Sequence, residues 1–111
     1  MTDLEVSTFQ KRPAYRYIRG SDRVPQLGTE DGIARVRLFN PTGIGTWYIS
    51  EYDPETRTAF GLADLGYPEL GYFDMQELIE FRGRFGLPLE RDLSWRPRPL
   101  AGIKGHAGRE Q

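Results

Sequence analysis

The sequence contains no cysteine and a single histidine, His106, among its 111 residues. Without cysteine the chain cannot form disulfide bonds, thiolate metal sites or a cysteine nucleophile. A Ser-His-Asp arrangement or a histidine-based metal site would depend on His106, which lies in a small, polar, glycine-rich C-terminal segment. We therefore expect a protein that is not an enzyme and that carries no cofactor and no metal.

Long apolar runs and a large net charge are also missing. No stretch approaches the roughly 18 apolar residues of a membrane span, and the N-terminus lacks the basic and apolar regions of a signal peptide. The formal net charge is −1, which argues against a strongly basic nucleic-acid-binding protein. The expected location is the cytoplasm, without membrane contact.

The charges that are present are unevenly distributed. Between Leu38 and Phe81 the only basic residue is Arg57, whereas the same segment contains eight acidic residues. These are Glu51, Asp53, Glu55, Asp64, Glu69, Asp74, Glu77 and Glu80. The segment from Arg82 to the C-terminus is basic, and most of its basic residues are arginine. Either segment can therefore attract a partner of opposite charge.

Composition and periodicity predict a small α+β domain. An apolar share of 38% and an aromatic share of 13% are enough for one hydrophobic core at this length. We expect an antiparallel meander of three to four strands with one capped helix packed on one face. The predicted boundaries are an irregular N-terminal arm at 1–32, a core domain at 33–100 and a flexible tail at 101–111.

Alternating apolar residues and turn residues locate the strands. The predicted strands are 33–39, a central strand at 46–52, and 58–63, joined by turns at 40–45 and 53–56. Both faces of 46–52 carry aromatic residues, so its buried face stays open at this stage. We expect an ordered loop at 64–73, and a fourth strand or extended edge segment at 89–95.

The strongest local signal is a helix start at Asp74. Asp74 and Glu77 have the spacing of a capping box, and Phe73 and Leu78 that of a hydrophobic staple. Met75, Leu78 and Ile79 share one helix face, which predicts two to three turns packed on the sheet. Gly83 or Gly86 is expected to end the helix in a left-handed conformation.

Candidate contact residues come from the aromatic and charged side chains. Trp and Tyr combine a large apolar area with a polar group, and Arg beside Trp favours phosphate or an acidic protein surface. The candidates are Trp47, Tyr48, Glu51, Glu69, Tyr72, Arg91, Trp95 and Arg96. Such rings are more often core residues, and such charges more often belong to a solvated surface. If they do form a contact surface, it is either the acidic middle segment or the C-terminal Arg/Trp cluster.

Several blocks of the sequence occur in the order found in a known family. These blocks are Thr46-Trp47-Tyr48, Glu51-Tyr52-Asp53, Phe60-Gly61-Leu62, Pro68-Glu69-Leu70-Gly71-Tyr72-Phe73 and the segment from Arg82 to Leu93. Over roughly 33–100 the chain resembles the 2958 family of prokaryotic domains of unknown function. The resemblance implies a setting in plasmids, integrative elements and phage-like islands, and it brings no catalytic residue.

Two functional hypotheses follow from these observations. The first is a non-catalytic interaction module of a mobile genetic element that binds a host defence or DNA-processing protein. The alternative is an accessory domain that binds nucleic acid or processes it with a metal ion, since carboxylates can hold Mg²⁺. A protein partner is expected, nucleic acid is a second possibility, and the oligomeric state is open.

Overall fold

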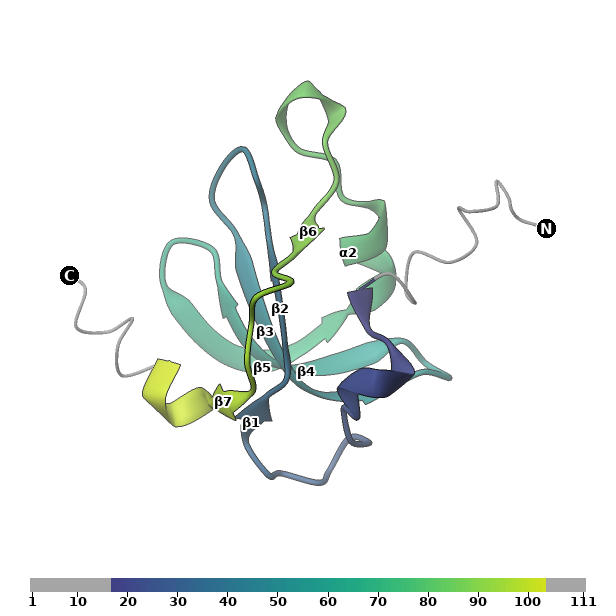
Figure 1. Ribbon diagram of the computed structural model, residues 1–111. Coiled ribbons are helices and arrows are strands. Elements are labelled where there is room, and N and C mark those ends of the chain that lie inside the picture. Colours follow the sequence, from purple (N-terminus) through teal and green to yellow (C-terminus); the bar gives the residue numbers. More distant parts are fainter. Residues whose placement is uncertain (1–16, 104–111) are drawn as a thin grey trace.

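The computed structural model describes residues 17–103, and a five-stranded antiparallel sheet forms its centre (Figure 1). The strand order is β5-β4-β3-β2-β6, and a separate two-stranded sheet pairs β1 with β7. The strands are β1 (Ile33–Ala34), β2 (Val36–Phe39), β3 (Thr46–Asp53), β4 (Thr58–Asp64), β5 (Pro68–Asp74), β6 (Glu90–Arg91) and β7 (Arg98–Pro99). The helical elements are η2 (Gly20–Asp22), α2 (Met75–Glu80), η3 (Arg84–Gly86) and a turn at 100–103.

The expected sheet-rich α+β fold is confirmed, but the number of strands and helices is not. The predicted strand at 33–39 is divided, because Ala34 pairs with β7 whereas Val36 pairs with β3. Strand β3 is central, between β2 and β4, as predicted. The expected strand at 89–95 is shorter, since only Glu90 and Arg91 pair with β2.

Turn residues form the two predicted hairpins. In the β2–β3 turn the Asn40 side chain accepts a hydrogen bond from the Thr42 N–H at 3.1 Å and donates one to the Ile44 carbonyl at 3.1 Å. In the β3–β4 turn Asp53 accepts hydrogen bonds from the Glu55 N–H and the Thr56 hydroxyl. These side chains satisfy backbone groups that the reversing chain leaves unpaired.

The predicted loop at 64–73 is wrong, because most of it forms β5. Strand β5 pairs along its whole length with β4, in a register that sets Leu70 opposite Leu62 and Tyr72 opposite Phe60. Its side chains do not alternate between buried and exposed, so the pattern that indicates a strand is missing. Pro68 is tolerated because β5 lies at the edge of the sheet.

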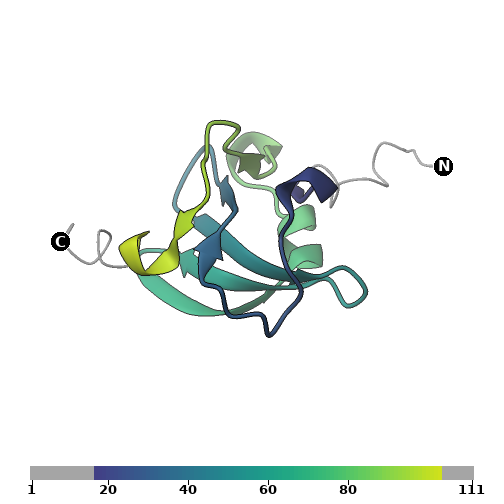
Figure 2. The ribbon, with the colours of Figure 1, turned by 60° about the horizontal axis from the view of Figure 1, so that its bottom comes forward.

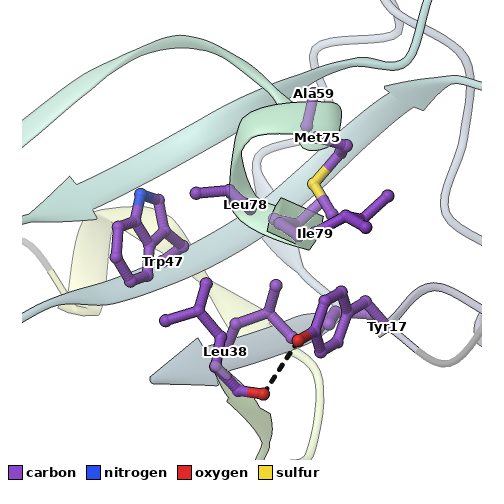
Figure 3. Packing of buried hydrophobic residues seen from close by; sticks show 10 residues of the cluster. Tyr17, Leu38, Trp47, Ala59, Met75, Leu78 and Ile79 are labelled. Carbon is purple, nitrogen blue, oxygen red and sulfur yellow. Dashed lines mark hydrogen bonds between the residues drawn. The ribbon is translucent and has the colours of Figure 1, made fainter. Parts of the chain in front are cut away.

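One side of the sheet, which we call the closed face, carries the main core. It presents Val36, Leu38, Trp47, Ile49 and Ala59, and α2 packs on it (Figure 3). Tyr17 is 2% exposed in the same cluster and donates its hydroxyl to the Leu89 carbonyl at 2.8 Å. A residue from the predicted N-terminal arm therefore belongs to the core.

Helix α2 begins where the sequence predicts but is shorter than expected. The Asp74 side chain accepts from the Gln76 N–H at 2.8 Å, so the cap bond goes to Gln76 and not to Glu77. Met75, Leu78 and Ile79 are buried as expected. The helix ends at Phe81 in an extended conformation, not at a glycine, and Arg82 donates to the Ile79 and Phe81 carbonyls.

Strand β3 contains a bulge at Ser50. Ile49 pairs with Gly61 and Glu51 pairs with Phe60, so Ser50 is an additional residue on β3. Gly61 is required here, because a Cβ atom at this position would lie 1.8 Å from the Tyr48 carbonyl oxygen. The bulge sends Tyr52 to the closed face and Glu51 to the opposite one.

A second, smaller cluster lies on the other side of the sheet, which we call the open face. It combines Ala34, Leu62, Leu100 and Ile103, with Tyr48 and Trp95 packed against them. Strands β1 and β7 and the turn at 100–103 supply this cover (Figure 2). Ile103 is buried although it belongs to the predicted tail.

The predicted domain boundaries at 32 and 100 stay predictions, and His106 lies outside the described residues. None of the helices within 17–103 is long and apolar enough to cross a bilayer.

Candidate interaction groove

The open face is covered over only part of its area. Along β4 and β5, Phe60 and Tyr72 lie on this face and pack edge to face with ring centroids 5.0 Å apart. Leu70, on the same face of β5, is 46% exposed, and Tyr72 is 68% exposed. Large apolar side chains that stay accessible next to a hydrophobic cluster are typical of an interaction surface.

A groove with a volume of about 540 Å³ lies between this exposed part and the loop that precedes β1. Phe60, Leu70 and Leu100 provide apolar lining. The groove's acidic lining residues are Glu30, Asp31 and Glu51, and none of the described residues that line it is basic. This volume lies in the range of ligand-binding pockets in general. The groove is therefore an apolar depression with an acidic lining.

A buried carboxylate holds the loop that forms one wall of the groove. Glu51 is 3% exposed, and its two carboxylate oxygens accept hydrogen bonds from the Gly28 N–H at 2.8 Å and the Glu30 N–H at 2.7 Å. Gly28, Glu30 and Gly32 all have positive φ angles. The positive φ angle is energetically unfavourable for Glu30, because a residue with a side chain disfavours the left-handed region. Glu51 thus fixes the loop in a strained shape.

The neighbouring acid, Asp31, is held by local hydrogen bonds and an ion pair. The Ile33 backbone N–H donates to Asp31 at 3.0 Å, and Arg35 forms an ion pair with it at 2.6 Å. The backbone hydrogen bond, followed by the bond from Arg35, lowers the pKa of Asp31 below its ordinary value. Arg35 therefore offsets part of the negative charge that Asp31 brings to the groove.

An aromatic and basic patch adjoins the covered end of the open face. The rings of Tyr48 and Trp95 are 5.4 Å apart, and the Trp95 indole N–H donates to the Ala34 carbonyl at 3.0 Å. The Arg98 guanidinium lies 4.6 Å from the Trp95 ring centroid. Arg37 is shared between Tyr48, at 6.0 Å, and an ion pair with Asp92 at 3.1 Å.

The candidate residues from the sequence are distributed over several environments. Tyr48 and Trp95 come together in the patch, and Arg96 is exposed next to Trp95 in the chain. Tyr72 packs against Phe60, which lines the groove, whereas Glu69, also exposed on β5, points to the opposite side of the strand. Trp47 is 6% exposed in the main core.

Arg91 connects the N-terminal segment to the sheet. Its guanidinium donates to both carboxylate oxygens of Asp22, at 2.6 and 2.7 Å, and to the Tyr17 carbonyl at 2.8 Å. Burial alone would raise the pKa of Asp22. The hydrogen bonds from Arg91 and from the Arg19 backbone N–H outweigh burial and lower the pKa of Asp22.

Sequence reasoning missed the residues that make the groove. Glu30 and Asp31 lie in a polar stretch without periodicity, and Leu70 lies in the segment predicted as a loop. Of the sequence candidates, Glu51 alone lines the groove, and Tyr72 contacts its lining residue Phe60. Within 17–103 no three His, Cys, Asp or Glu side chains are grouped so that they could hold a metal ion.

The fold and the groove define a small α+β domain with one closed and one partly open sheet face. The chain belongs to the family described as Protein of unknown function (DUF2958), whose model matches residues 14–104. This match extends beyond the resemblance at 33–100 and includes Tyr17 and Asp22. Comparisons with curated proteins and with solved structures give no match.

Proposed function

We propose that this protein is a non-catalytic interaction module of a mobile genetic element, and that it acts in the cytoplasm on a host defence or DNA-processing protein. The observation that carries the proposal is the apolar groove with an acidic lining on the open face. The mobile-element setting comes from the family resemblance. The cysteine-free composition supports the cytoplasmic location.

The chemistry of the groove favours a protein segment over nucleic acid. The three acidic lining residues disfavour phosphate groups, although Arg35 pairs with Asp31 and offsets part of that charge. The accessible surfaces of Leu70 and Tyr72 instead suit apolar side chains. A partner segment with apolar residues and at least one Lys or Arg satisfies both features.

The position of β5 suggests how such a segment binds. Strand β5 ends the strand order of the sheet, so within 17–103 no strand pairs with its outer edge. An extended segment can add to such an edge through backbone hydrogen bonds and place alternate side chains on the open face. The proposed ligand is therefore an extended segment with apolar residues at alternate positions.

Synthetic peptides test this proposal directly. The probes are fluorescently labelled seven-residue peptides, the length of β5, with leucine at alternate positions and lysine between them; a second set replaces lysine by glutamate. We expect the lysine set to bind in fluorescence anisotropy titrations and the glutamate set to bind at least about tenfold more weakly. Equal binding of both sets, or of neither, would contradict the proposal.

Matched variants assign the binding to the groove. Leu70→Lys replaces an apolar lining residue by a positive charge that repels lysine, and we expect it to weaken binding of the lysine peptides by about tenfold or more. Leu93→Lys is the control, because Leu93 is 77% exposed and does not line the groove. Glu30→Lys, with Glu55→Lys in the exposed β3–β4 turn as its control, tests the acidic lining separately. Equal effects within a pair would place the binding elsewhere.

The basic and aromatic patch supports a second candidate function, binding of nucleic acid as an accessory domain. The observation in its favour is the Arg98 guanidinium stacked on Trp95, with Arg96 exposed nearby. A gel shift with single-stranded and duplex DNA at low salt tests it, and Arg98→Ala should weaken any shift. Absence of a shift at low salt would remove this candidate.

A further inference from the structure

The loop that follows α2 exposes an aromatic side chain. Phe85 is 85% exposed and has a φ angle of +61°. A bulky residue rarely adopts this backbone conformation, so the surrounding loop must impose it. The Gly83 N–H donates to the Leu87 carbonyl at 2.8 Å, and the Leu87 N–H donates to the Arg84 carbonyl at 3.2 Å. The loop at 83–87 is thus closed by its own backbone and holds Phe85 in solvent.

The same loop is basic and otherwise apolar. Arg84 lies 5.7 Å from the Phe85 ring centroid, and Leu87 is 41% exposed. No acidic residue occurs between Phe81 and Leu89. Aromatic residues, phenylalanine included, and arginine are both enriched in protein–protein interfaces. This loop therefore has the chemistry expected of a ligand for an acidic, apolar groove.

Loop and groove lie at opposite ends of the molecule. In Figure 1 the loop projects at the top, whereas residues 30–32 and 99–101, which line the groove, lie at the bottom. The rotated view in Figure 2 keeps these segments apart. A chain therefore cannot place Phe85 in its own groove without unfolding, but it can place it in the groove of another copy.

We propose that the loop at 83–87 of one copy inserts Phe85 into the groove of a second copy, so that chains associate head to tail. Phe60, Leu70 and Leu100 would surround the ring, and Arg84 would face Glu30. The inference rests on the proposed function only in using the same groove, and a partner segment would compete with the second copy. Because the two contacting surfaces differ, the contact repeats into a ring or an open filament.

Sedimentation equilibrium of the full chain over micromolar to millimolar concentrations tests the association. We expect the average mass to rise with concentration and the rise to weaken with added salt. Phe85→Asn, which suits a left-handed backbone, and Leu70→Lys, which removes an apolar contact and repels Arg84, should each weaken association by about thirtyfold. Leu93→Lys, an exposed position outside both surfaces, should associate like the parent chain. Circular dichroism melts confirm that each variant is folded.

A mixing experiment separates this contact from any other. Phe85→Asn keeps an intact groove and Leu70→Lys keeps an intact loop, so an equimolar mixture should form one-to-one dimers and nothing larger. A parent chain that stays monomeric throughout, or a mixture that stays monomeric, would overturn the head-to-tail contact. The peptide titrations are read independently: lysine peptides that bind a monomeric parent chain would leave the proposed function standing while this inference fails.

Discussion

The closed face of the sheet is covered by α2 and Tyr17, whereas the open face is covered only where β1, β7 and the turn at 100–103 cross it. On the closed face Leu38, Ile49 and Met75 have no exposed surface. On the open face Leu70 remains half exposed beside an acidic groove. One sheet therefore serves two purposes, with stability concentrated on one side and accessible apolar surface on the other.

This difference between the two faces predicts which substitutions change stability and which change binding. A truncation on the closed face removes packed atoms and leaves a cavity. A truncation on the open face removes atoms that water already contacts, so it should change binding more than stability.

The largest effect is expected at the centre of the sheet, where β3 and β4 meet. Gly61→Ala would bring its Cβ against the Tyr48 carbonyl, and we expect a loss of about 3 kcal/mol or more in the free energy of unfolding. Gly71, its cross-strand partner on β5, has open space at the same atom, so Gly71→Ala is the matched control. Urea denaturation measures both, and equal midpoints would contradict the close approach seen at Gly61.

Truncating one leucine on each face compares how much each face contributes to stability. Leu38→Ala on the closed face should lower the free energy of unfolding by about 3 kcal/mol, because the site is fully buried. Leu70→Ala on the open face should cost less than about 1 kcal/mol. The same urea titrations apply. A loss at Leu70 as large as that at Leu38 would show that the open face is not separable from the core.

The ion pair between Asp22 and Arg91 predicts a pH dependence. The pKa of Asp22 is lower in the folded chain than in the unfolded chain. Its contribution to the free energy of unfolding is therefore fully present above the unfolded-state pKa, and it is lost as the pH falls through the folded-state pKa. Asp22→Asn should cost about 2 kcal/mol at pH 7, and the difference from the parent chain should narrow below about pH 4. Urea midpoints at several pH values measure this.

The double variant Asp22→Asn with Arg91→Met checks the cause. If the ion pair is responsible, the sum of the losses in unfolding free energy of the two single variants should exceed the loss of the double variant. Additive losses would assign the effect to each side chain separately.

The smallest effect concerns the helix that closes the core. Asp74→Ala removes the acceptor of the Gln76 N–H and should cost about 1 kcal/mol. Asp74→Asn, which keeps an acceptor oxygen, should recover most of the loss. An unchanged melting midpoint for Asp74→Ala would contradict the capping role.

Much of the closed face could be predicted because its signals are local. The cap at Asp74, the buried helix residues and the two hairpin turns depend on side chains within a few positions of one another. The alternation of Val36 and Leu38 also predicted their burial in the main core correctly, whereas Ala34, which was expected on the same face, is buried in the open-face cluster. Tyr17 escaped prediction because its partner, the Leu89 carbonyl, is distant in sequence.

The open face could not be predicted because it depends on long-range pairing and backbone angles. Strand β5 has exposed residues on both sides, so no periodicity marks it. The groove wall needs a positive φ at Glu30 and a hydrogen bond from Glu51, and neither feature has a local sequence signal. Phe85 likewise looks like an ordinary core residue until its surroundings are known.

The extra residue at Ser50 changes the phase of β3. Before it, odd-numbered side chains such as Ile49 enter the helix-covered core; after it, the even-numbered Tyr52 does. Strict alternation would have carried the carboxylate of Glu51 in among aliphatic groups. The count of residues between Ile49 and Tyr52, more than their chemistry, therefore decides which environment that carboxylate enters.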